Sequence, residues 1–232
     1  MKQLQRLEIL VGNENLNKIT NTTVLILGLG GVGSYATESL VRSGIKKIII
    51  VDKDIIDISN LNRQLMTLHS NIGQNKTDVW EKRIKDINPT CEVIKINKFI
   101  SENNIEELLN YKPDYIVDAC DTIETKKELI RKCIMKNIKL ISSMGTGKRL
   151  DPTKFKIVDI RKTYNDPIAR IIRKMIKYEK IKNKIMVICS EEPPLKLESK
   201  IIASNSFVPS TAGLLCTSYI INDILKNGND NA

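Results

Sequence analysis

The chain has 232 residues, enough for one sizeable hydrophobic core, and its 41% apolar and 28% charged residues are typical of a soluble globular protein. Five cysteines without close spacing argue against a disulfide framework and against a C-x-x-C zinc knuckle, and they favour a reducing cytoplasm. The sequence contains no long apolar signal-peptide core and no apolar stretch long enough to cross a bilayer. We therefore expect a cytoplasmic protein without a membrane role.

The net charge is +10, and nearly all of the excess lies in one segment. Between Lys148 and Lys184 there are 13 Lys and Arg residues and 4 acidic ones, a local excess of 9 positive charges. A lysine-rich composition could produce this as a solvated basic face. The clustering instead favours a polyanionic partner with salt-sensitive binding. At 4% aromatic residues, extended surfaces for base stacking are not expected.

In chain order, an amphipathic helix over residues 1–18 precedes the stretch around which the chain is organised. A short β-branched run, Thr23–Leu27, predicts a buried strand. A helix over residues 34–43 follows, with Gly44 as its left-handed C-cap, and Lys47–Val51 predict the next strand. These elements form a βαβ unit.

The turn of this unit carries a glycine motif, G-x-G-x-x-G, made by Gly28, Gly30 and Gly33 with Gly31 inside it. Glycines allow backbone N–H groups to approach phosphate oxygens, and the positive end of the following helix dipole points to the same place. Asp52 ends the second strand 19 residues beyond Gly33, where a carboxylate can accept hydrogen bonds from ribose. The unit therefore predicts an adenine-nucleotide site. The alternative is a turn whose glycines serve only helix–strand packing.

Strands and helices continue to alternate to residue 147, which predicts an open, mostly parallel α/β sheet of the Rossmann-like type with helices on both faces. Beyond residue 147 two strands flank a basic helix, and we expect this extension to add antiparallel strands. We expect a single adenylating domain (1–232), with a nucleotide-binding part (1–147) and a basic, substrate-facing part (148–232). The further strands are expected at residues 91–97, 114–119, 140–143, 156–160 and 186–190, and the further helices at 76–87, 105–109, 124–135, 168–178 and 214–225.

The turn Gly145-Thr146-Gly147-Lys148 is similar to part of a P-loop, but Ser142 and Arg149 occupy positions that a P-loop reserves for glycine and Ser/Thr. We interpret it as a turn at the carboxyl edge of the sheet that lines the pocket.

Three charged residues bear on which nucleotide is bound. Arg63 and Lys76 could neutralise a triphosphate, and Asp121, at the end of a strand, could hold Mg²⁺ beside the phosphates. Each has a simpler alternative: a surface ion pair for Arg63, a solvated lysine for Lys76 and a helix N-cap for Asp121. Together with the glycine turn, they favour attack on an α-phosphorus.

The motifs G-x-G-G-V-G-S, VDKD, S-N-x-N-R-Q, G-x-x-K, INP and D-A-x-D-T, spread over about residues 6–147, resemble the ubiquitin-activating-enzyme-like (ThiF/MoeB/HesA) adenylating superfamily. The resemblance implies a ligase-like enzyme that uses ATP and Mg²⁺ to activate a carboxylate as an acyl adenylate, and a homodimer. It implies that Asp52 holds ribose, that Asn60, Arg63 and Lys76 hold phosphates and that Asp121 holds the metal. Arg6 would reach ATP across the dimer interface, and Asp54 and Gln64 complete the implied nucleotide-binding set.

Three later motifs, KTYNDPIA (162–169), SEEPP (190–194) and FVPSTAG (207–213), resemble the tRNA threonylcarbamoyladenosine dehydratase (TcdA/CsdL-like) branch of that superfamily. This branch implies tRNA carrying threonylcarbamoyladenosine as the substrate, with a sulfur-relay protein as a further partner. The implied RNA-binding candidates are Lys162, Arg170, Arg173 and Lys174. The segment from 191 to 207 is short, so part of a substrate loop is expected to be reduced.

Two other functions remain open on the sequence. Relatives that activate sulfur-carrier or ubiquitin-like proteins usually have paired C-x-x-C zinc ligands and often a thioester cysteine, and this chain has no such zinc pairs. Cys189 and Cys216 could be nucleophiles, but we interpret them as buried structural thiols. The other hypothesis is a non-catalytic regulator that binds a dinucleotide. Arg63, Lys76 and Asp121 together argue against it.

Overall fold

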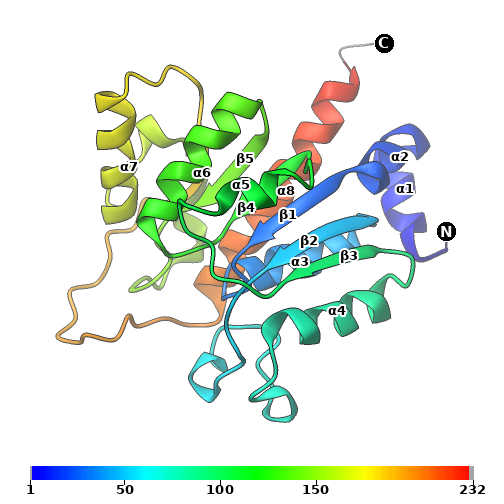
Figure 1. The fold of residues 1–232 in the computed structure, drawn as a ribbon, viewed down its shortest axis with the longest axis horizontal. Helices are drawn as coiled ribbons and strands as arrows, with labels where there is room; N and C mark the ends of the chain where they lie inside the picture. The colour runs from blue at the N-terminus through cyan, green and yellow to red at the C-terminus, as the bar shows by residue number, and fades with distance from the viewer. Residues whose placement is uncertain (1, 230–232) are drawn as a thin grey trace.

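A computed structural model describes residues 2–229, in which seven strands and eight α-helices succeed one another along the chain (Figure 1). The strands are β1 (Thr23–Leu27), β2 (Lys47–Val51), β3 (Glu92–Ile96), β4 (Tyr115–Asp118), β5 (Lys139–Ser143), β6 (Phe155–Asp159) and β7 (Met186–Ser190). The helices are α1 (Gln5–Val11), α2 (Asn13–Asn21), α3 (Gly33–Arg42), α4 (Lys76–Ile87), α5 (Ile105–Leu109), α6 (Ile123–Lys136), α7 (Pro167–Tyr178) and α8 (Phe207–Asn229).

All seven strands belong to one sheet, in the order β3-β2-β1-β4-β5-β7-β6. The expected open, mostly parallel α/β sheet is therefore confirmed. The extension beyond residue 147 adds two strands, and only one of them is antiparallel: β7 runs parallel to β5, while β6 pairs antiparallel with β7.

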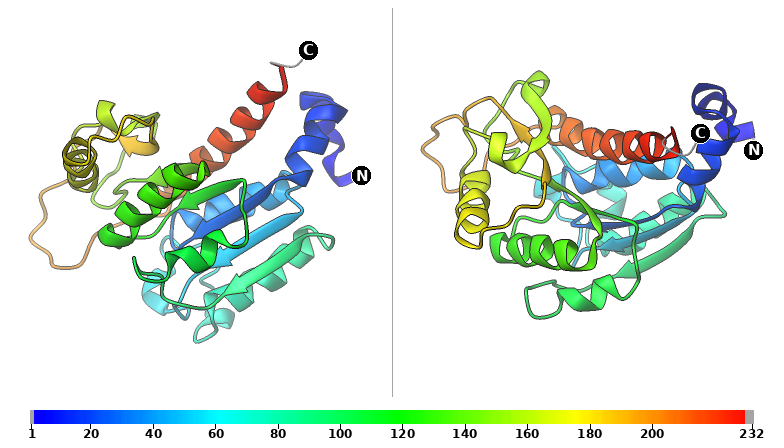
Figure 2. Two further views of the ribbon diagram at one scale, coloured as in Figure 1. Left: turned by 45° about the horizontal axis from the view of Figure 1, so that its top comes forward. Right: turned by 90° about the horizontal axis from the view of Figure 1, so that it is seen from above.

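Alternating side chains of the central strands form the cores on the two faces of the sheet. Val24 and Ile26 of β1 pack with α3, α4 and α8 on one face, whereas Leu25 and Leu27 pack with α5 and α6 on the other. Figure 2 shows the same three layers, with α8 along one face and α5 and α6 on the opposite one. Burial on both faces explains why the strand sequences are almost continuously apolar.

Two expected helix boundaries were wrong. Gly12, with φ of +81°, separates α1 from α2, so the N-terminal segment is not a single helix. The last helix begins at Phe207, seven residues before the expected start, because the Asn205 side chain accepts a hydrogen bond from the Val208 N–H and Pro209 is tolerated in a first helical turn. Among the described residues, no helix is both long and apolar enough to cross a membrane.

The long helix α8 lies against α3 at a glycine. A Cβ built on Gly213 would lie 2.3 Å from the Val32 carbonyl oxygen and 3.0 Å from the Ala36 nitrogen. Since both neighbours are backbone atoms, a methyl group there must push the two helices apart.

Gly213→Ala should therefore destabilise the fold by about 1–3 kcal/mol, the usual cost of overpacking. Urea unfolding followed by circular dichroism measures this cost. The matched control is Ser218→Ala on the exposed side of the same helix, which should change the unfolding free energy by less than about 0.5 kcal/mol. Equal stability of Gly213→Ala and the unmodified protein would contradict the close packing of α3 and α8.

Candidate active site

A cavity of about 370 Å³ opens at the carboxyl ends of β1, β2 and β4. After β1 the chain crosses to α3 on one face of the sheet, and after β4 it crosses to α6 on the other, so the cavity lies at the topological switch point where α/β proteins bind ligands. Its lining includes Gly28, Gly30, Gly31, Asp52, Asp54, Asn60, Arg63, Gln64, Lys76 and Asp121, all of them predicted nucleotide-binding residues.

The glycines of the first turn have two different roles. A Cβ on Gly28 would lie 2.8 Å from the Ala119 carbonyl oxygen, and one on Gly33 only 1.8 Å from the Gly28 oxygen. These two glycines are thus required by packing, as the alternative interpretation held. A Cβ on Gly30 would meet only the Gln64 side-chain nitrogen, at 3.8 Å, so Gly30 leaves backbone open to the cavity.

Asp52 is held in place by two backbone groups. One carboxylate oxygen accepts the Leu29 N–H at 2.7 Å, and the other accepts the Asp54 N–H at 2.9 Å. The first bond joins the end of β2 to the glycine turn. The carboxylate is thereby oriented at the place where the ribose of a nucleotide lies in this kind of fold.

Lys76 begins α4 and is buried, so the alternative of a solvated lysine is wrong. Its Nζ lies 2.9 Å from an Asp54 carboxylate oxygen and 3.7 Å from one of Asp52. Two carboxylates therefore position the lysine at the cavity wall, a partnership that the sequence analysis did not foresee. The ammonium group is fixed beside the glycine turn, where it can meet a phosphate.

Arg63 and Asn60 lie on the irregular segment that follows β2. Arg63 donates hydrogen bonds to the Ser59 carbonyl at 3.0 Å and to the Asn62 side-chain oxygen at 3.1 Å, so both of these bonds go to neutral groups rather than to a carboxylate. Buried Gln64 completes this wall of the cavity.

Asp121 follows β4 by three residues, lines the cavity and is exposed. The residue at the N-cap of α6 is Thr122, so the N-cap alternative for Asp121 is wrong. Residues 2–229 contain no cluster of three or more His, Cys, Asp or Glu side chains that could hold a metal ion. Mg²⁺ at nucleotide sites commonly takes one or two carboxylates together with substrate phosphates, so a single open carboxylate fits this ion.

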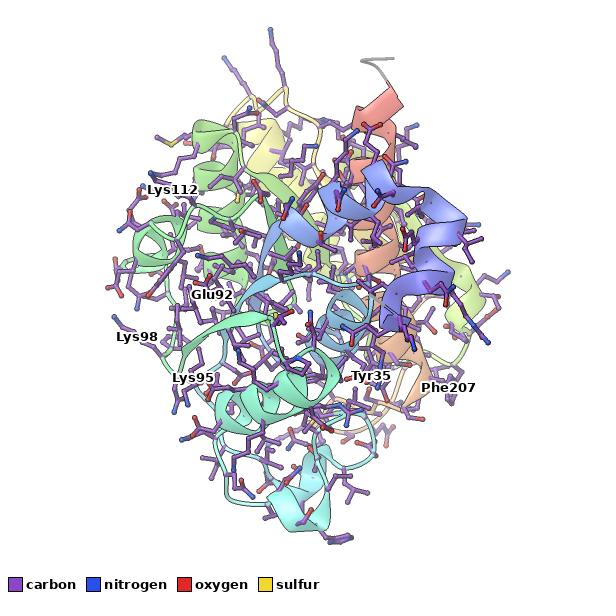
Figure 3. All side chains as sticks on the ribbon, turned by 90° about the vertical axis from the view of Figure 1, so that its right-hand side faces the viewer. Tyr35, Glu92, Lys95, Lys98, Lys112 and Phe207 are labelled. Atoms are coloured by element: carbon purple, nitrogen blue, oxygen red, sulfur yellow. The ribbon has the colours of Figure 1, made fainter. Side chains whose placement is uncertain are left out.

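Several lining residues were not predicted. Thr146 confirms the expectation that the turn after β5 reaches the pocket, but Lys53, Lys98, Phe99, Ser204 and Pro209 were missed as lining residues. The Lys53 ammonium lies 4.7 Å from the centre of the Phe99 ring. Figure 3 shows Lys98 extending outward at the edge of the sheet. Two of them carried a signal in the sequence, since Lys53 belongs to the VDKD motif and Pro209 to the FVPSTAG motif.

Arg6 is not among the residues that line this cavity; it is exposed on α1. Its predicted role needs a second copy of the chain and stays a prediction.

The basic residues of the extension form a separate surface, the α7 groove, of about 570 Å³. It is lined by Arg161, Arg170, Arg173, Lys174, Ile176, Lys177, Lys180 and Ile181. Lys162 lies next to it in the sequence but not in its lining. Arg173 donates a hydrogen bond to the Thr163 hydroxyl, while Arg170 and Lys174 are exposed.

Not every cation of the basic segment faces solvent. Arg149 is buried, 3.1 Å from a carboxylate oxygen of buried Asp166, and donates to the carbonyls of Gly145, Asn165 and Glu192. It therefore braces the turn after β5 against the start of α7 and adds nothing to the basic surface.

The thiols of Cys189 and Cys216 are buried, and burial raises the pKa of each to about 12. The expected burial is therefore confirmed, and thiols that stay protonated at neutral pH agree with the interpretation as structural thiols.

The fold and the cavity define a nucleotide-binding protein whose glycine turn, carboxylates and cations meet at one sheet edge. The ThiF family matches residues 2–204. A tRNA threonylcarbamoyladenosine dehydratase of Bacillus subtilis is 44% identical over 98% of this chain and 96% of its own length. Crystal structures of E. coli tRNA N6-threonylcarbamoyladenosine dehydratase, TcdA, are similar with TM-scores of 0.94 (in complex with ATP; 28% identity, 100% and 97% coverage) and 0.93 (with AMP; 29%, 99% and 96%).

The chain belongs to the ThiF family, as the motifs of its nucleotide-binding part predicted.

Gly30→Ala separates nucleotide binding from folding. The added methyl group has room in the fold but enters the space through which phosphates would approach the turn. We expect an unchanged melting temperature and ATP binding weakened by about 10- to 100-fold. Isothermal titration calorimetry with ATP, beside a thermal melt, tests both expectations. Unaltered ATP affinity would place the phosphates elsewhere.

Proposed function

We propose that this protein is an ATP-dependent tRNA threonylcarbamoyladenosine dehydratase. The observation that carries the proposal is the meeting of Asp52, Lys76, Arg63 and Asp121 around one cavity beside an open glycine turn. The name of the B. subtilis relative, at 44% identity over nearly the full length of both chains, supports the same activity. The α7 groove supplies a surface for the polyanionic substrate.

In this proposal ATP lies across the switch point. Asp52 accepts hydrogen bonds from the ribose, backbone N–H groups of the glycine turn bind phosphate oxygens, and Asn60, Arg63, Gln64 and Lys76 surround the rest of the triphosphate. Asp54 keeps Lys76 in place. The cations offset the charge that builds up as pyrophosphate leaves, an electrostatic effect that is strong because the groups are fixed before the reaction.

The reaction proceeds in two displacements. A threonyl carboxylate oxygen attacks the α-phosphorus, which forms an acyl adenylate and releases pyrophosphate. The carbamoyl oxygen then attacks the activated acyl carbon, AMP leaves with the former carboxylate oxygen, and loss of a proton completes the oxazolone ring. The second step is intramolecular, so it needs positioning more than an enzyme nucleophile. This agrees with the protonated, buried state of Cys189 and Cys216.

Mg²⁺ would be held by Asp121 together with phosphate oxygens, and it would neutralise charge on the leaving pyrophosphate. A homodimer would bring Arg6 of one protomer to the cavity of the other. The cytoplasm, where tRNA is found, is the expected location.

The proposal is tested by incubating the protein with ATP, Mg²⁺ and tRNA that carries threonylcarbamoyladenosine. Mass spectrometry of the digested nucleosides should show a product lighter by one water, with AMP formed in equal amount. An unchanged nucleoside would refute the dehydratase. Pyrophosphate exchange that required a small carrier protein and ignored tRNA would point instead to the carrier-activating enzymes.

Asp121→Ala should lower AMP formation by about 100-fold or more while leaving the melting temperature unchanged, because an exposed carboxylate that organises the leaving phosphates is lost. A steady-state assay of AMP release at saturating Mg²⁺ measures the loss. Glu124→Ala, an exposed carboxylate three residues farther along the chain and outside the cavity lining, is the control and should retain turnover. Near-normal AMP release by Asp121→Ala would remove Asp121 from the metal site.

Charge reversal in the α7 groove tests the RNA surface. The double variant Arg170→Glu/Lys174→Glu should bind tRNA more weakly and reduce the slope of log affinity against log salt by about 2, while ATP binding is unchanged. Arg173 is left intact because it holds Thr163. Lys82→Glu/Lys226→Glu carries the same charge change on exposed sites outside the groove. Equal salt slopes for both double variants would show that the groove is only a solvated face.

A further inference from the structure

A charged cluster lies buried beneath the nucleotide cavity, and its residues have no role in the proposed reaction. Lys126 of α6 and Asp118 at the end of β4 are 1% and 0% exposed, respectively, with Nζ 3.0 Å from a carboxylate oxygen. Burial lowers the pKa of Lys126, but the Asp118 carboxylate outweighs that effect and raises it, so the lysine is charged at neutral pH. Removing two charges from water is costly, and apolar residues often fill such space equally well.

The cluster connects the ends of two neighbouring strands. The Lys126 ammonium donates to the Ser143 carbonyl of β5 at 2.9 Å, and the Ser142 hydroxyl donates to Asp118 at 2.6 Å. Asp118 and Ser142 are also partners in the register of β4 and β5. Four groups from three elements, α6, β4 and β5, are therefore fixed to one another at the carboxyl edge of the sheet.

The second oxygen of Asp118 holds the turn that leads to Asp121. It accepts the Cys120 N–H at 3.3 Å and the Cys120 thiol at 3.0 Å. Ala119, between them, donates its N–H to the Leu27 carbonyl of β1 at 2.9 Å. Cys120, Asp121 and Thr122 all line the nucleotide cavity. The carboxylate of Asp118 thus connects the buried lysine with the cavity wall.

We propose that Lys126, acting through Asp118, is a positioning residue that fixes the turn carrying Asp121 in its nucleotide-binding position. Lys126 balances the charge of Asp118, which would otherwise lie unpaired three residues from Asp121 and close to incoming phosphates. Held in this way, the Asp118 carboxylate stays in place as the acceptor of the Cys120 N–H. The inference rests on the proposed function only in assuming that Mg²⁺ and ATP bind at this cavity.

The test compares Mg²⁺-dependent ATP binding, by calorimetry over a range of Mg²⁺ concentrations, in four variants of the full chain. Lys126→Met leaves Asp118 unpaired and should raise the half-saturating Mg²⁺ concentration by about 10- to 100-fold, as loss of an outer partner does at metal sites. Lys126→Met/Asp118→Asn removes both charges but keeps an acceptor for Cys120, and it should restore binding. Lys126→Met/Asp118→Leu removes charge and acceptor, and should remain impaired although it folds.

The fourth variant, Lys139→Met, is the matched control. Lys139 also joins β4 and β5 to an aspartate, lying 3.1 Å from the Tyr115 hydroxyl and 2.6 Å from Asp223, but at the opposite end of the two strands. It should bind Mg²⁺ and ATP normally. Thermal melts of all four variants separate loss of fold from loss of position.

Hydrogen exchange of the unmodified protein adds a readout that needs no variant: the Cys120 amide should be protected, since Asp118 accepts its hydrogen bond. Exchange at the rate of an open loop would overturn the proposal. Normal Mg²⁺ dependence of ATP binding in Lys126→Met or in Lys126→Met/Asp118→Leu would also overturn the proposal. Impaired binding in Lys126→Met/Asp118→Asn would show that Lys126 does not act through Asp118.

Failure of the dehydratase assay with normal Mg²⁺-dependent ATP binding would refute the proposed function and leave the positioning role to be decided by these variants. Absence of Mg²⁺-dependent ATP binding in the unmodified protein would overturn the positioning role as well.

Discussion

The site depends on the close approach of two turns, the one after β1 and the one after β4. Gly28 faces the Ala119 carbonyl at a distance that no side chain could share, and the Ala119 N–H bonds to the end of β1. Because of this contact, the glycine turn, which can bind phosphates, lines the same cavity as Asp121. A side chain at Gly28 would separate the two turns, and with them the phosphate-binding backbone and the carboxylate. The packing glycines therefore serve function indirectly, by setting the distance between parts that act together.

Much of this site could be predicted because its parts follow local rules. A strand, a glycine turn, a helix and an acid at fixed spacing leave little freedom, and Gly28, Gly30 and Asp52 lie where the spacing predicted. The partners of Lys76 could not be predicted, since Asp54 is 22 residues away and meets it only where the chain folds back and Ile55 pairs with Asn75 in an isolated β-bridge. The buried pair of Arg149 and Asp166 could not be predicted either, because a count of charged residues treats every arginine as exposed.

The boundaries that were wrong have local causes that compete with hydrophobic periodicity. A single glycine with positive φ, Gly12, interrupts a pattern that otherwise predicts one helix. At the other end of the chain, Asn205 and Pro209 start α8 before its continuous apolar stretch. The extension was expected to add antiparallel strands, because its two strands were expected to lie next to each other. They do pair antiparallel, but β7 also lies beside β5 and runs parallel to it. Such placement is decided by which edge of the sheet is open.

The hairpin of β6 and β7 encloses η5 (Ile160–Lys162) and α7 between two paired strand ends, since Asp159 faces Met186 in the register. The excursion thus leaves and re-enters the sheet at nearly one point. An insertion with such anchorage can be lengthened, shortened or replaced without altering the strands that carry the nucleotide cavity. Relatives of this chain could thus acquire different polyanionic substrates by replacing the segment between β6 and β7, while the nucleotide cavity at the sheet edge stays the same.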